Sequence, residues 1–326
     1  MKIEIKKDVI ETAYDHALCR GFPYYKFHLT EKYEEFEKLC KYNSANLLDG
    51  ENIKQTMHSL GLAWSYFSHH WEVKIKNQKT PMDIWFDRSL LKKAIERRLK
   101  RGGLQMLLPD GSMTDSQLRK ALRSYSGVQS VSNFRPTAAA CIYRHFAGDG
   151  VVWDMSCGFG GRLLGAMSSG AVRKYIGTDP SNPTFIGLTK MASDFSHLDI
   201  DVQLNKVGSE FFVPGEKVDL CFTSPPYFDT EMYIGDETQS FRAYDSLENW
   251  NEQFLRKTIK NCKSSLKSTG IMILNVANVK NHPMLENDTL RIASEEGFFL
   301  EKTYRMLLSN ISKGGYKSEP VFVFKL

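Results

Sequence analysis

Short apolar segments alternate with amphipathic stretches over the second half of the chain. Seven of these segments have the length and the glycine, proline or polar boundaries of strands. They are Gly150–Asp154, Tyr175–Asp179, Asp201–Asn205, Val218–Phe222, Gly270–Val276, Glu301–Leu308 and Pro320–Lys325. Helical spacing begins at about Leu163, runs from Asn249 to Leu266, and runs again from Leu285 to Glu296 before Gly297. Strands that alternate with helices predict an α/β protein.

The most informative segment directly follows the run Val218–Phe222. It reads Thr223-Ser224-Pro225-Pro226-Tyr227-Phe228-Asp229. Two prolines extend neither a helix nor a central strand, so we expect a rigid elbow that projects Ser224 and Tyr227 beyond the sheet. Open α/β sheets bind ligands at such strand ends. A short hydroxyl, a carbonyl beside proline and an aromatic ring together suit a flat ring that bears an exocyclic amine.

This segment closely resembles motif IV of the amino-methyltransferases that act on nucleic-acid bases, (Asp/Asn/Ser)-Pro-Pro-(Tyr/Phe). Its serine form is similar to the cytosine-N4 branch of that family. The resemblance implies catalytic roles for Ser224, Pro225, Pro226 and Tyr227. For the tetrapeptide alone, a proline turn that merely closes a strand is the alternative.

A glycine-rich turn follows the strand Gly150–Asp154 and leads into a helix. Glycines let the backbone approach a ligand closely, and the helix start supplies free N–H groups. The spacing is not the dinucleotide fingerprint and there is no Walker lysine, which disfavours phosphate binding. The turn resembles methyltransferase motif I, Asp-x-x-x-Gly-x-Gly-Gly, which wraps the methionine part of S-adenosylmethionine. The cofactor contacts that it implies are Asp154, Ser156, Cys157, Gly158, Phe159, Gly160 and Gly161.

Three further segments are similar to cofactor-binding parts of the same family. Asp179 is expected to bind the ribose hydroxyls, and it also suits a helix cap before Pro180. Ser209 and Glu210 stand where family members contact the adenine ring, although Gly-Ser-Glu also fits a surface turn. A motif X-like segment precedes a helix from Ala138 to Phe146, and its arginine is expected to meet the cofactor carboxylate. It comprises Asn133, Phe134, Arg135 and Pro136.

The order of these motifs over residues 131–326 implies a Rossmann-like, seven-stranded class I methyltransferase sheet with S-adenosylmethionine as cofactor. Acceptors at Ser224 and the Pro225 carbonyl would draw the amine hydrogens out of the base plane. Tyr227 would stack on a base flipped from the duplex. Phe228 and Asp229 are expected to begin a lid over that base which continues to Trp250, with a packed surface loop as the alternative.

Residues 1–130 are expected to form a mainly helical, basic domain that binds the nucleic acid. They contain 22 Lys and Arg against 16 Asp and Glu, so the net charge of +5 lies in this part. Six cations on the helix Leu90–Arg101 are expected to contact phosphates, although a solvated face is the usual alternative. They are Lys92, Lys93, Arg97, Arg98, Lys100 and Arg101. The aromatic cluster from Trp64 to Trp71 is expected to be core.

Only about 60 residues separate Gly161 from Ser224, which leaves no room for the recognition insert of many family members. Recognition is then expected from residues 1–130, with duplex DNA favoured and RNA possible. Related Pro-Pro-Tyr enzymes methylate guanine amines in RNA or glutamine amides in proteins, mostly with Asp or Asn in place of Ser224. Adenine-N6 methylation and a catalytically silent nucleic-acid-binding subunit stay open. So do a restriction-system partner and the oligomeric state.

The cysteines are scattered, without a Cys-x-x-Cys pair. They are Cys19, Cys40, Cys141, Cys157, Cys221 and Cys262. With no signal-peptide pattern and no apolar run that would span a bilayer, we expect a cytoplasmic, reducing compartment and no membrane association. No Pro-Cys pair supplies the nucleophile of cytosine-C5 methylation. The adjacent His69 and His70 lack partners at ligand spacing, so no metal is expected.

Overall fold

The computed structural model describes residues 5–75, 78–125, 131–233, 235–310 and 316–326, which form two compact units. Unit 1 comprises Met1–Lys26, Ser68–Ser132 and Glu231–Ile234. Unit 2 comprises Phe27–Phe67, Asn133–Thr230 and Gly235–Leu326. The chain does pass from one unit to the other near residue 130, where the sequence suggested a boundary. Residues 27–67, however, belong with the sheet of unit 2.

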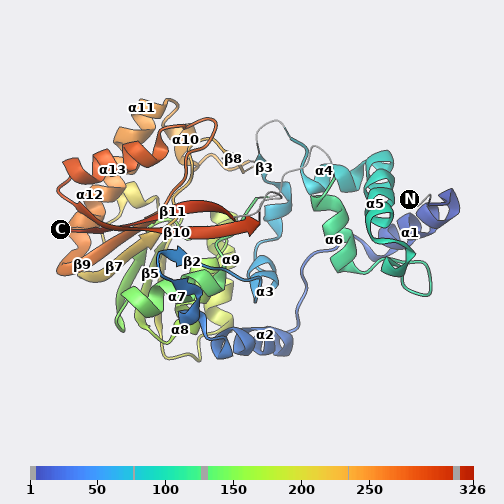
Figure 1. Ribbon diagram of the computed structural model, residues 1–326, viewed down its shortest axis with the longest axis horizontal. Coiled ribbons are helices and arrows are strands. Elements are labelled where there is room, and N and C mark those ends of the chain that lie inside the picture. Colours follow the sequence, from blue (N-terminus) through green and yellow to red (C-terminus); the bar gives the residue numbers. More distant parts are fainter. Residues whose placement is uncertain (1–4, 76–77, 126–130, 234, 311–315) are drawn as a thin grey trace. The chain divides into compact units, whose positions relative to one another are not determined.

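Unit 1 is built mainly from helices (Figure 1). They are α1 (Lys7–Arg20), α4 (Pro81–Phe86), α5 (Arg88–Gly102) and α6 (Asp115–Arg123), with the 3₁₀ turns η2 (Ser68–Glu72) and η3 (Leu104–Met106). Their apolar faces share one core, which contains Tyr14, Trp85, Leu91 and Leu118. Two short strands, β3 (Lys74–Ile75) and β8 (Glu231–Met232), pair in antiparallel fashion. The helical character expected of the N-terminal part is therefore confirmed.

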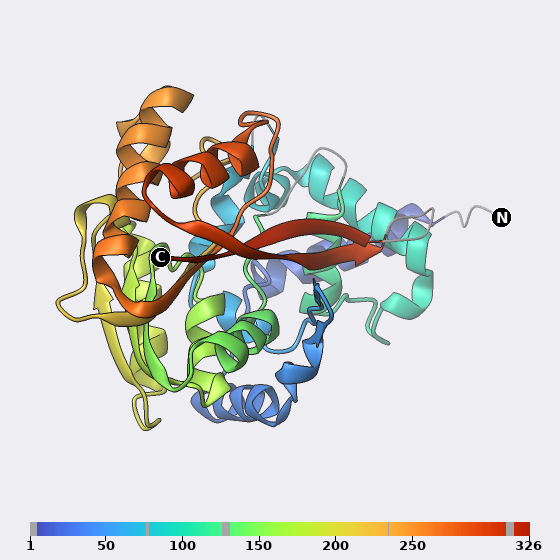
Figure 2. The ribbon, with the colours of Figure 1, turned by 60° about the vertical axis from the view of Figure 1, so that its left-hand side comes forward.

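Unit 2 contains a mixed sheet with the strand order β1-β2-β10-β11-β9-β7-β4-β5-β6 in the described residues. Its seven principal strands are β4 (Gly150–Asp154), β5 (Val172–Thr178), β6 (Asp201–Asn205), β7 (Val218–Thr223), β9 (Leu266–Asn275), β10 (Phe299–Asn310) and β11 (Tyr316–Lys325). The first five run parallel, and the β10–β11 hairpin closes the sheet in antiparallel fashion (Figure 2). All seven predicted strands are confirmed. The fold is thus the predicted Rossmann-like α/β fold, in which a mainly parallel sheet ends in an antiparallel hairpin.

Helices cover both faces of this sheet. Along β7, Phe222 packs edge-on against Tyr143 of α7 (Pro136–Phe146), with ring centroids 5.4 Å apart. Its neighbour Cys221 belongs to the opposite cluster, with Cys262 of α12 (Arg256–Ser265). Successive strand residues point to opposite faces, so a strand that is covered on both sides is apolar throughout. This explains why these strands were recognisable as continuous apolar runs.

The remaining helices of unit 2 are α8 (Gly161–Ser169), α9 (Asn182–Asp194), α10 (Ser240–Ala243), α11 (Leu247–Trp250) and α13 (Leu285–Glu295). Of these, α8, α11 and α13 lie close to their predicted ranges, whereas α9 and α10 had no predicted range. The helix predicted over Asn249–Leu266 is observed as α11, a π-helical turn η5 (Asn251–Leu255) and α12 in succession. Its apolar positions are all buried, namely Trp250, Phe254, Ile259, Cys262 and Leu266.

Residues 27–67 hold the elements that the sequence did not reveal. They are α2 (Leu29–Lys41), η1 (Ser44–Leu47), β1 (Leu48–Asp49), β2 (Asn52–Ile53) and α3 (Leu60–Trp64). β2 adds to the sheet beside β10 in parallel fashion. Two-residue strands have no measurable periodicity, so only their distant partner identifies them. The predicted aromatic core is confirmed, since Trp64, Phe67 and Trp71 are buried.

Across the described residues, no helix is long and apolar enough to cross a membrane. In the same residues no group of three or more His, Cys, Asp or Glu side chains is arranged to hold a metal ion. All six cysteines are free, and only Cys19 and Cys40 are exposed.

Candidate active site

The glycine-rich turn and the proline elbow leave the sheet from adjacent parallel strands. β4 pairs with β7 through Val152–Leu220 and Trp153–Cys221, so their carboxyl ends lie at the same edge. From β4 the chain proceeds outward to β5 and β6, whereas from β7 it proceeds in the other direction to β9. Such a reversal of strand order opens a crevice in which open α/β sheets bind ligands. The two segments with candidate chemistry therefore meet at the expected place.

A buried network around Asp154 holds this crevice together. Asp154 is fully buried at the end of β4. Its Oδ2 accepts from Arg162 Nε at 2.9 Å and from the Tyr175 hydroxyl at 2.7 Å. Its Oδ1 accepts from the Thr223 hydroxyl at 2.9 Å and from Ser156 N–H at 3.2 Å. Two acceptor positions on each oxygen are thereby filled, so Asp154 has none left for a ligand.

Arg162, to which the sequence gave no role, is the charge partner of Asp154. Its guanidinium is buried, also donates to the Ser156 carbonyl, and lies 5.5 Å from the centroid of the Phe134 ring. The sequence did contain a sign of this role, because an arginine in the first turn of an otherwise apolar helix requires an acidic partner. Thr223, which directly precedes the elbow, links it to this network. Its hydroxyl lies 2.9 Å from Asp154 Oδ1 and 3.4 Å from the Ser156 carbonyl oxygen.

The glycine turn has the backbone that its composition predicts. Gly158 and Gly160 adopt positive φ angles of 54° and 68°, which disfavour other residues. Gly160 is the N-cap of α8, and the side chain of Phe159 is buried. Cys157 N–H donates to the Thr178 carbonyl at 3.0 Å. Burial raises the pKa of the Cys157 thiol well above its usual range, so this group is a neutral packing residue and no nucleophile.

The motif X-like segment lies against this turn. The Asn133 side-chain amide donates to the Phe159 carbonyl at 2.9 Å. Pro136 is the first residue of α7, and Arg135 precedes it and donates to the Asn133 carbonyl at 3.2 Å. The Phe134 carbonyl oxygen is so close to Gly161 that a Cβ added at Gly161 would lie 1.9 Å from it. The structure thus brings residues 133–136 and 158–161 together.

This close approach predicts the effect of adding one methyl group. Gly161→Ala requires the backbone at Phe134 to move, and overpacking of this kind costs about 1–3 kcal/mol. We expect the variant to unfold at correspondingly lower urea concentration. Gly215→Ala is the matched control, because no atom lies within 4 Å of its added Cβ and its φ is ordinary. Equal midpoints for the two variants would contradict the close packing of the turn.

Asp179 follows β5 and faces the glycine turn. Its Oδ2 accepts from Gly158 N–H at 2.9 Å, and its Oδ1 accepts from Ser181 N–H at 3.1 Å. Burial raises the pKa of Asp179 to about 7, although both N–H groups act in the opposite direction. The bond to Ser181 is the turn expected before α9. Each oxygen retains a further acceptor position, so the turn and a ligand are compatible roles.

Ser209 and Glu210 lie in the 3₁₀ turn η4 (Ser209–Phe211) after β6. The Ser209 hydroxyl is buried 2.8 Å from that of Thr258 on α12, which makes it a packing contact. Glu210 Oε1 accepts from the Tyr244 hydroxyl at 3.5 Å, whereas its buried Oε2 has no hydrogen-bond partner in the described residues. Burial raises the pKa of the Glu210 carboxyl. Only Glu210 of this pair retains an acceptor for a ligand.

The elbow is held from two other strands. Pro225 is buried, Pro226 is exposed, and Ser224 and Tyr227 are half-buried. The Tyr227 hydroxyl lies 3.4 Å from that of Ser224 and donates to the Asn275 carbonyl at the end of β9 at 3.2 Å. Burial raises the pKa of the Glu319 carboxyl of β11, which lies near the Tyr227 and Asn275 side chains. The Tyr227 ring is therefore fixed at its outer end.

The first lid residues turn back into unit 2. Phe228 has a positive φ of 53°, and its ring packs edge-on against Trp250 with centroids 6.0 Å apart. Asp229 Oδ1 accepts from the Asn281 side chain at 2.8 Å. Residues 231–234 then belong to unit 1, where β8 pairs with β3. The segment expected to be a lid thus passes through unit 1 and returns to unit 2 at Gly235, and the half-buried Phe228 packs against the core cluster of unit 2.

The predicted basic helix is α5 in unit 1. Lys92 is bonded to Glu11 and lies over the Tyr14 ring, Arg98 donates to Gln117 at 2.9 Å, and Lys100 pairs with Glu96 at 2.6 Å. Lys93 and Arg101 are exposed and Arg97 is half-exposed. Half of the six predicted phosphate contacts therefore already have protein partners.

No family model matches this chain, and no curated protein matches it. It is similar in structure to magnesium protoporphyrin IX methyltransferase from Synechocystis PCC 6803, solved with bound S-adenosylmethionine (15% identity, 55% of this chain, 70% of that chain, TM-score 0.39). It is also similar to the N-methyltransferase NodS from Bradyrhizobium japonicum WM9 (11% identity, 58% of this chain, 92% of that chain, TM-score 0.41). A third similar structure is the ribosomal protein L11 methylase from Lactobacillus delbrueckii subsp. bulgaricus (16% identity, 60% of this chain, 80% of that chain, TM-score 0.39). None of them identifies a substrate for this chain.

Proposed function

We propose that this chain is an S-adenosylmethionine-dependent methyltransferase that modifies the exocyclic N4 amine of cytosine in DNA. The observation that carries the proposal is the bond from the Thr223 hydroxyl to Asp154, which joins the elbow to the strand end that bears the glycine turn. A methyl donor held by the turn and an amine held by the elbow would then be neighbours. The serine at the first elbow position favours cytosine over adenine.

The free acceptors and backbone groups of the crevice fit the parts of S-adenosylmethionine. Gly158 to Gly161 and the start of α8 would surround its methionine part, and Arg135 would donate to its carboxylate. The remaining acceptor positions on Asp179 suit ribose hydroxyls, and the unpartnered Oε2 of Glu210 suits an amine such as that of adenine. Asp154 would position the turn without touching the ligand.

The elbow residues would promote methyl transfer by orienting the amine. When bound, S-adenosylmethionine supplies an activated methyl group, so the protein has only to present the amine and exclude water. The Ser224 hydroxyl and the Pro225 carbonyl would accept the two amine hydrogens and localise the lone pair on nitrogen. The Tyr227 ring, held by its hydroxyl, would stack on the base after it leaves the duplex. The amine proton leaves after methyl transfer, so a strong base is unnecessary.

The raised pKa of Asp179 predicts a pH dependence of cofactor binding. Ribose hydroxyls donate best to the ionised carboxylate, so binding releases a proton wherever the free protein holds one. We expect affinity for S-adenosylmethionine to rise with pH up to about 7, by at most about tenfold per unit, and then to level off. Titration calorimetry across this range measures it.

Asp179→Asn is the control for that titration. It keeps the size of the side chain and removes the ionisable group, so we expect weaker binding with no inflection near pH 7. The folding stability of the unliganded protein has the opposite pH dependence. Its Asp179 pKa exceeds the ordinary value of about 3.9, so this carboxyl destabilises the fold increasingly as the pH rises from about 4 to about 7. A wild-type affinity that falls with rising pH would contradict the assignment.

Turnover tests the proposal as a whole. Release of S-adenosylhomocysteine is measured with duplex DNA, single-stranded DNA, RNA and no nucleic acid. We expect release only when nucleic acid is present and most with DNA. Release with RNA alone would identify RNA as the substrate in place of DNA. Binding of S-adenosylmethionine without release on any polymer would indicate a catalytically silent binding subunit.

A further inference from the structure

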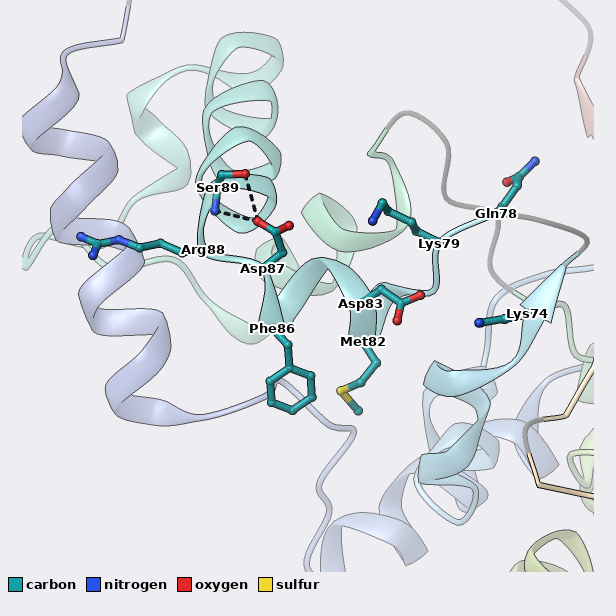
Figure 3. A pocket seen from close by; sticks show the side chains of 9 residues that line it. All are labelled: Lys74, Gln78, Lys79, Met82, Asp83, Phe86, Asp87, Arg88 and Ser89. Atoms are coloured by element: carbon teal, nitrogen blue, oxygen red, sulfur yellow. Dashed lines mark hydrogen bonds between the residues drawn. The ribbon is translucent and has the colours of Figure 1, made fainter.

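Unit 1 has an open hollow beside α4 and the start of α5 that the proposed function does not use. Its volume is about 840 Å³. The side chains around it come from β3, from residues 78 and 79 before α4, from α4 itself and from the start of α5 (Figure 3). They are Lys74, Gln78, Lys79, Met82, Asp83, Phe86, Asp87, Arg88 and Ser89.

Phe86 is the unusual residue of this hollow. It is 79% exposed, the highest value among the large apolar side chains of the described residues, although its neighbours Ile84 and Trp85 are buried. Met82 lies one turn earlier on α4, and the two side chains project from the same side of the helix (Figure 3). The pair forms a small apolar surface in water that the core of unit 1 does not require.

The charged lining of the hollow is net positive by one charge, with Lys74, Lys79 and Arg88 against Asp83 and Asp87. Asp83 accepts from Thr80 N–H at 2.8 Å and Asp87 accepts from Ser89 N–H at 2.9 Å, so both carboxylates cap helices. Among the described residues neither Lys74 nor Lys79 forms an ion pair, although the charge of Lys79 acts on Asp87. Arg88 lies 3.8 Å from Glu11, which is bonded more closely to Lys92. Arg88 also lies 5.6 Å from the centroid of the Tyr14 ring, so Lys74 and Lys79 are the cations left to meet an anionic ligand.

The distribution of charge between the units points the same way. Unit 1 contains 18 Lys and Arg against 11 Asp and Glu, a net charge of +7, although the whole chain carries only +5. The remainder, unit 2, is therefore net negative at −2. An exposed ring within a cationic surface is the combination with which proteins bind unpaired nucleic-acid strands, because the ring stacks on a base while the cations meet phosphates.

We infer that this hollow binds an unpaired nucleobase, with the Phe86 ring stacked on the base and the surrounding cations on its flanking phosphates. An intact duplex offers no free base face to a projecting ring, whereas a single strand or an opened duplex does. An apolar protein partner would require a wider apolar surface than Phe86 and Met82 supply. The inference rests on the proposed function, because a nucleic-acid substrate is what brings such a strand to the protein.

Binding of fluorescent oligonucleotides to the full chain tests this site without requiring methyl transfer. Single-stranded DNA, RNA of the same sequence and the matching duplex are titrated against wild type, Phe86→Ala and Phe86→Tyr. We expect Phe86→Ala to weaken single-strand binding about tenfold, Phe86→Tyr to retain it, and the duplex to change less than about twofold. The DNA and RNA titrations distinguish the two sources of an unpaired base.

Two controls make the result specific. Phe299→Ala removes an exposed phenylalanine from β10 of unit 2 (52% exposed) and is expected to bind like wild type. Lys79→Ala is expected to reduce the salt dependence of binding by about one ion, equally for any sequence. Equal single-strand affinities for wild type and Phe86→Ala would overturn the site, as would a Phe86-dependent attachment to phosphatidylserine vesicles without oligonucleotide binding. Phe86-dependent binding without methyl transfer would instead leave the site standing and refute the proposed activity.

Discussion

Ser224→Ala is expected to lower the rate of methyl transfer about a hundredfold, the usual loss when one preorganised hydrogen-bond partner of a transition state is removed. Ser224 is half-buried directly after β7, and within the described part of the chain its hydroxyl has one hydrogen-bond partner, the Tyr227 hydroxyl at the long distance of 3.4 Å. Its replacement therefore disturbs little of the fold. The affinity for S-adenosylmethionine is expected to stay unchanged, because the cofactor residues lie on the other segment.

Two variants of Tyr227 separate hydrogen bonding from stacking. Tyr227→Phe removes the bond to the Asn275 carbonyl and keeps the ring, so we expect a modest loss of rate. Tyr227→Ala also removes the ring and is expected to raise the Michaelis constant for the nucleic acid, because a stacked base contributes about 1–3 kcal/mol. Single-turnover kinetics measure each effect. An unchanged rate for Ser224→Ala would refute the role of the elbow in orienting the amine.

Asp154→Ala is expected to destabilise the protein by about 3–5 kcal/mol, because it leaves the buried Arg162 without its counter-charge. Both side chains are at most 5% exposed, and Nε lies 2.9 Å from Oδ2. The same substitution also removes the acceptor for the Tyr175 and Thr223 hydroxyls. Urea unfolding monitored by fluorescence and by circular dichroism measures the loss.

The double variant Asp154→Asn/Arg162→Met identifies the cause. It removes both charges together and is expected to recover part of the stability, since an unpaired buried charge costs more than an absent pair. Lys38→Ala breaks the exposed Lys38–Glu35 pair, of similar distance at 2.6 Å, and is expected to change little. If Asp154→Ala and Lys38→Ala unfolded at the same urea concentration, the network would not support the crevice.

The strands and motif order were predictable because each rests on local chemistry. β4 and β6 begin and end at their predicted residues, and β4 was recognisable as an apolar run because its five residues are all buried. The proline elbow and the positive-φ glycines follow from the residue types alone. Fold class and the meeting of turn and elbow follow in turn from the order of these elements.

Contacts between distant segments were not predictable in this way. The sequence suggested that Asp154 contacts the cofactor, but the partners that occupy it come from β5, α8 and the end of β7. Glu319 reaches Tyr227 from a strand more than ninety residues away. Residues 27–67 show no strong strand pattern, and only β10 reveals that β2 belongs to the sheet. The chemistry of a residue was local, whereas its partners depended on the tertiary fold.

Identification of the methylated nucleoside tests the proposed function most directly. Duplex and single-stranded DNA are incubated with the protein and methyl-labelled S-adenosylmethionine, digested to nucleosides and separated by chromatography. We predict label in N4-methyldeoxycytidine for wild type and little or none for Ser224→Ala. Label in N6-methyladenine would contradict the choice of base, and the absence of label from every nucleoside, with S-adenosylmethionine demonstrably bound, would contradict the proposed function.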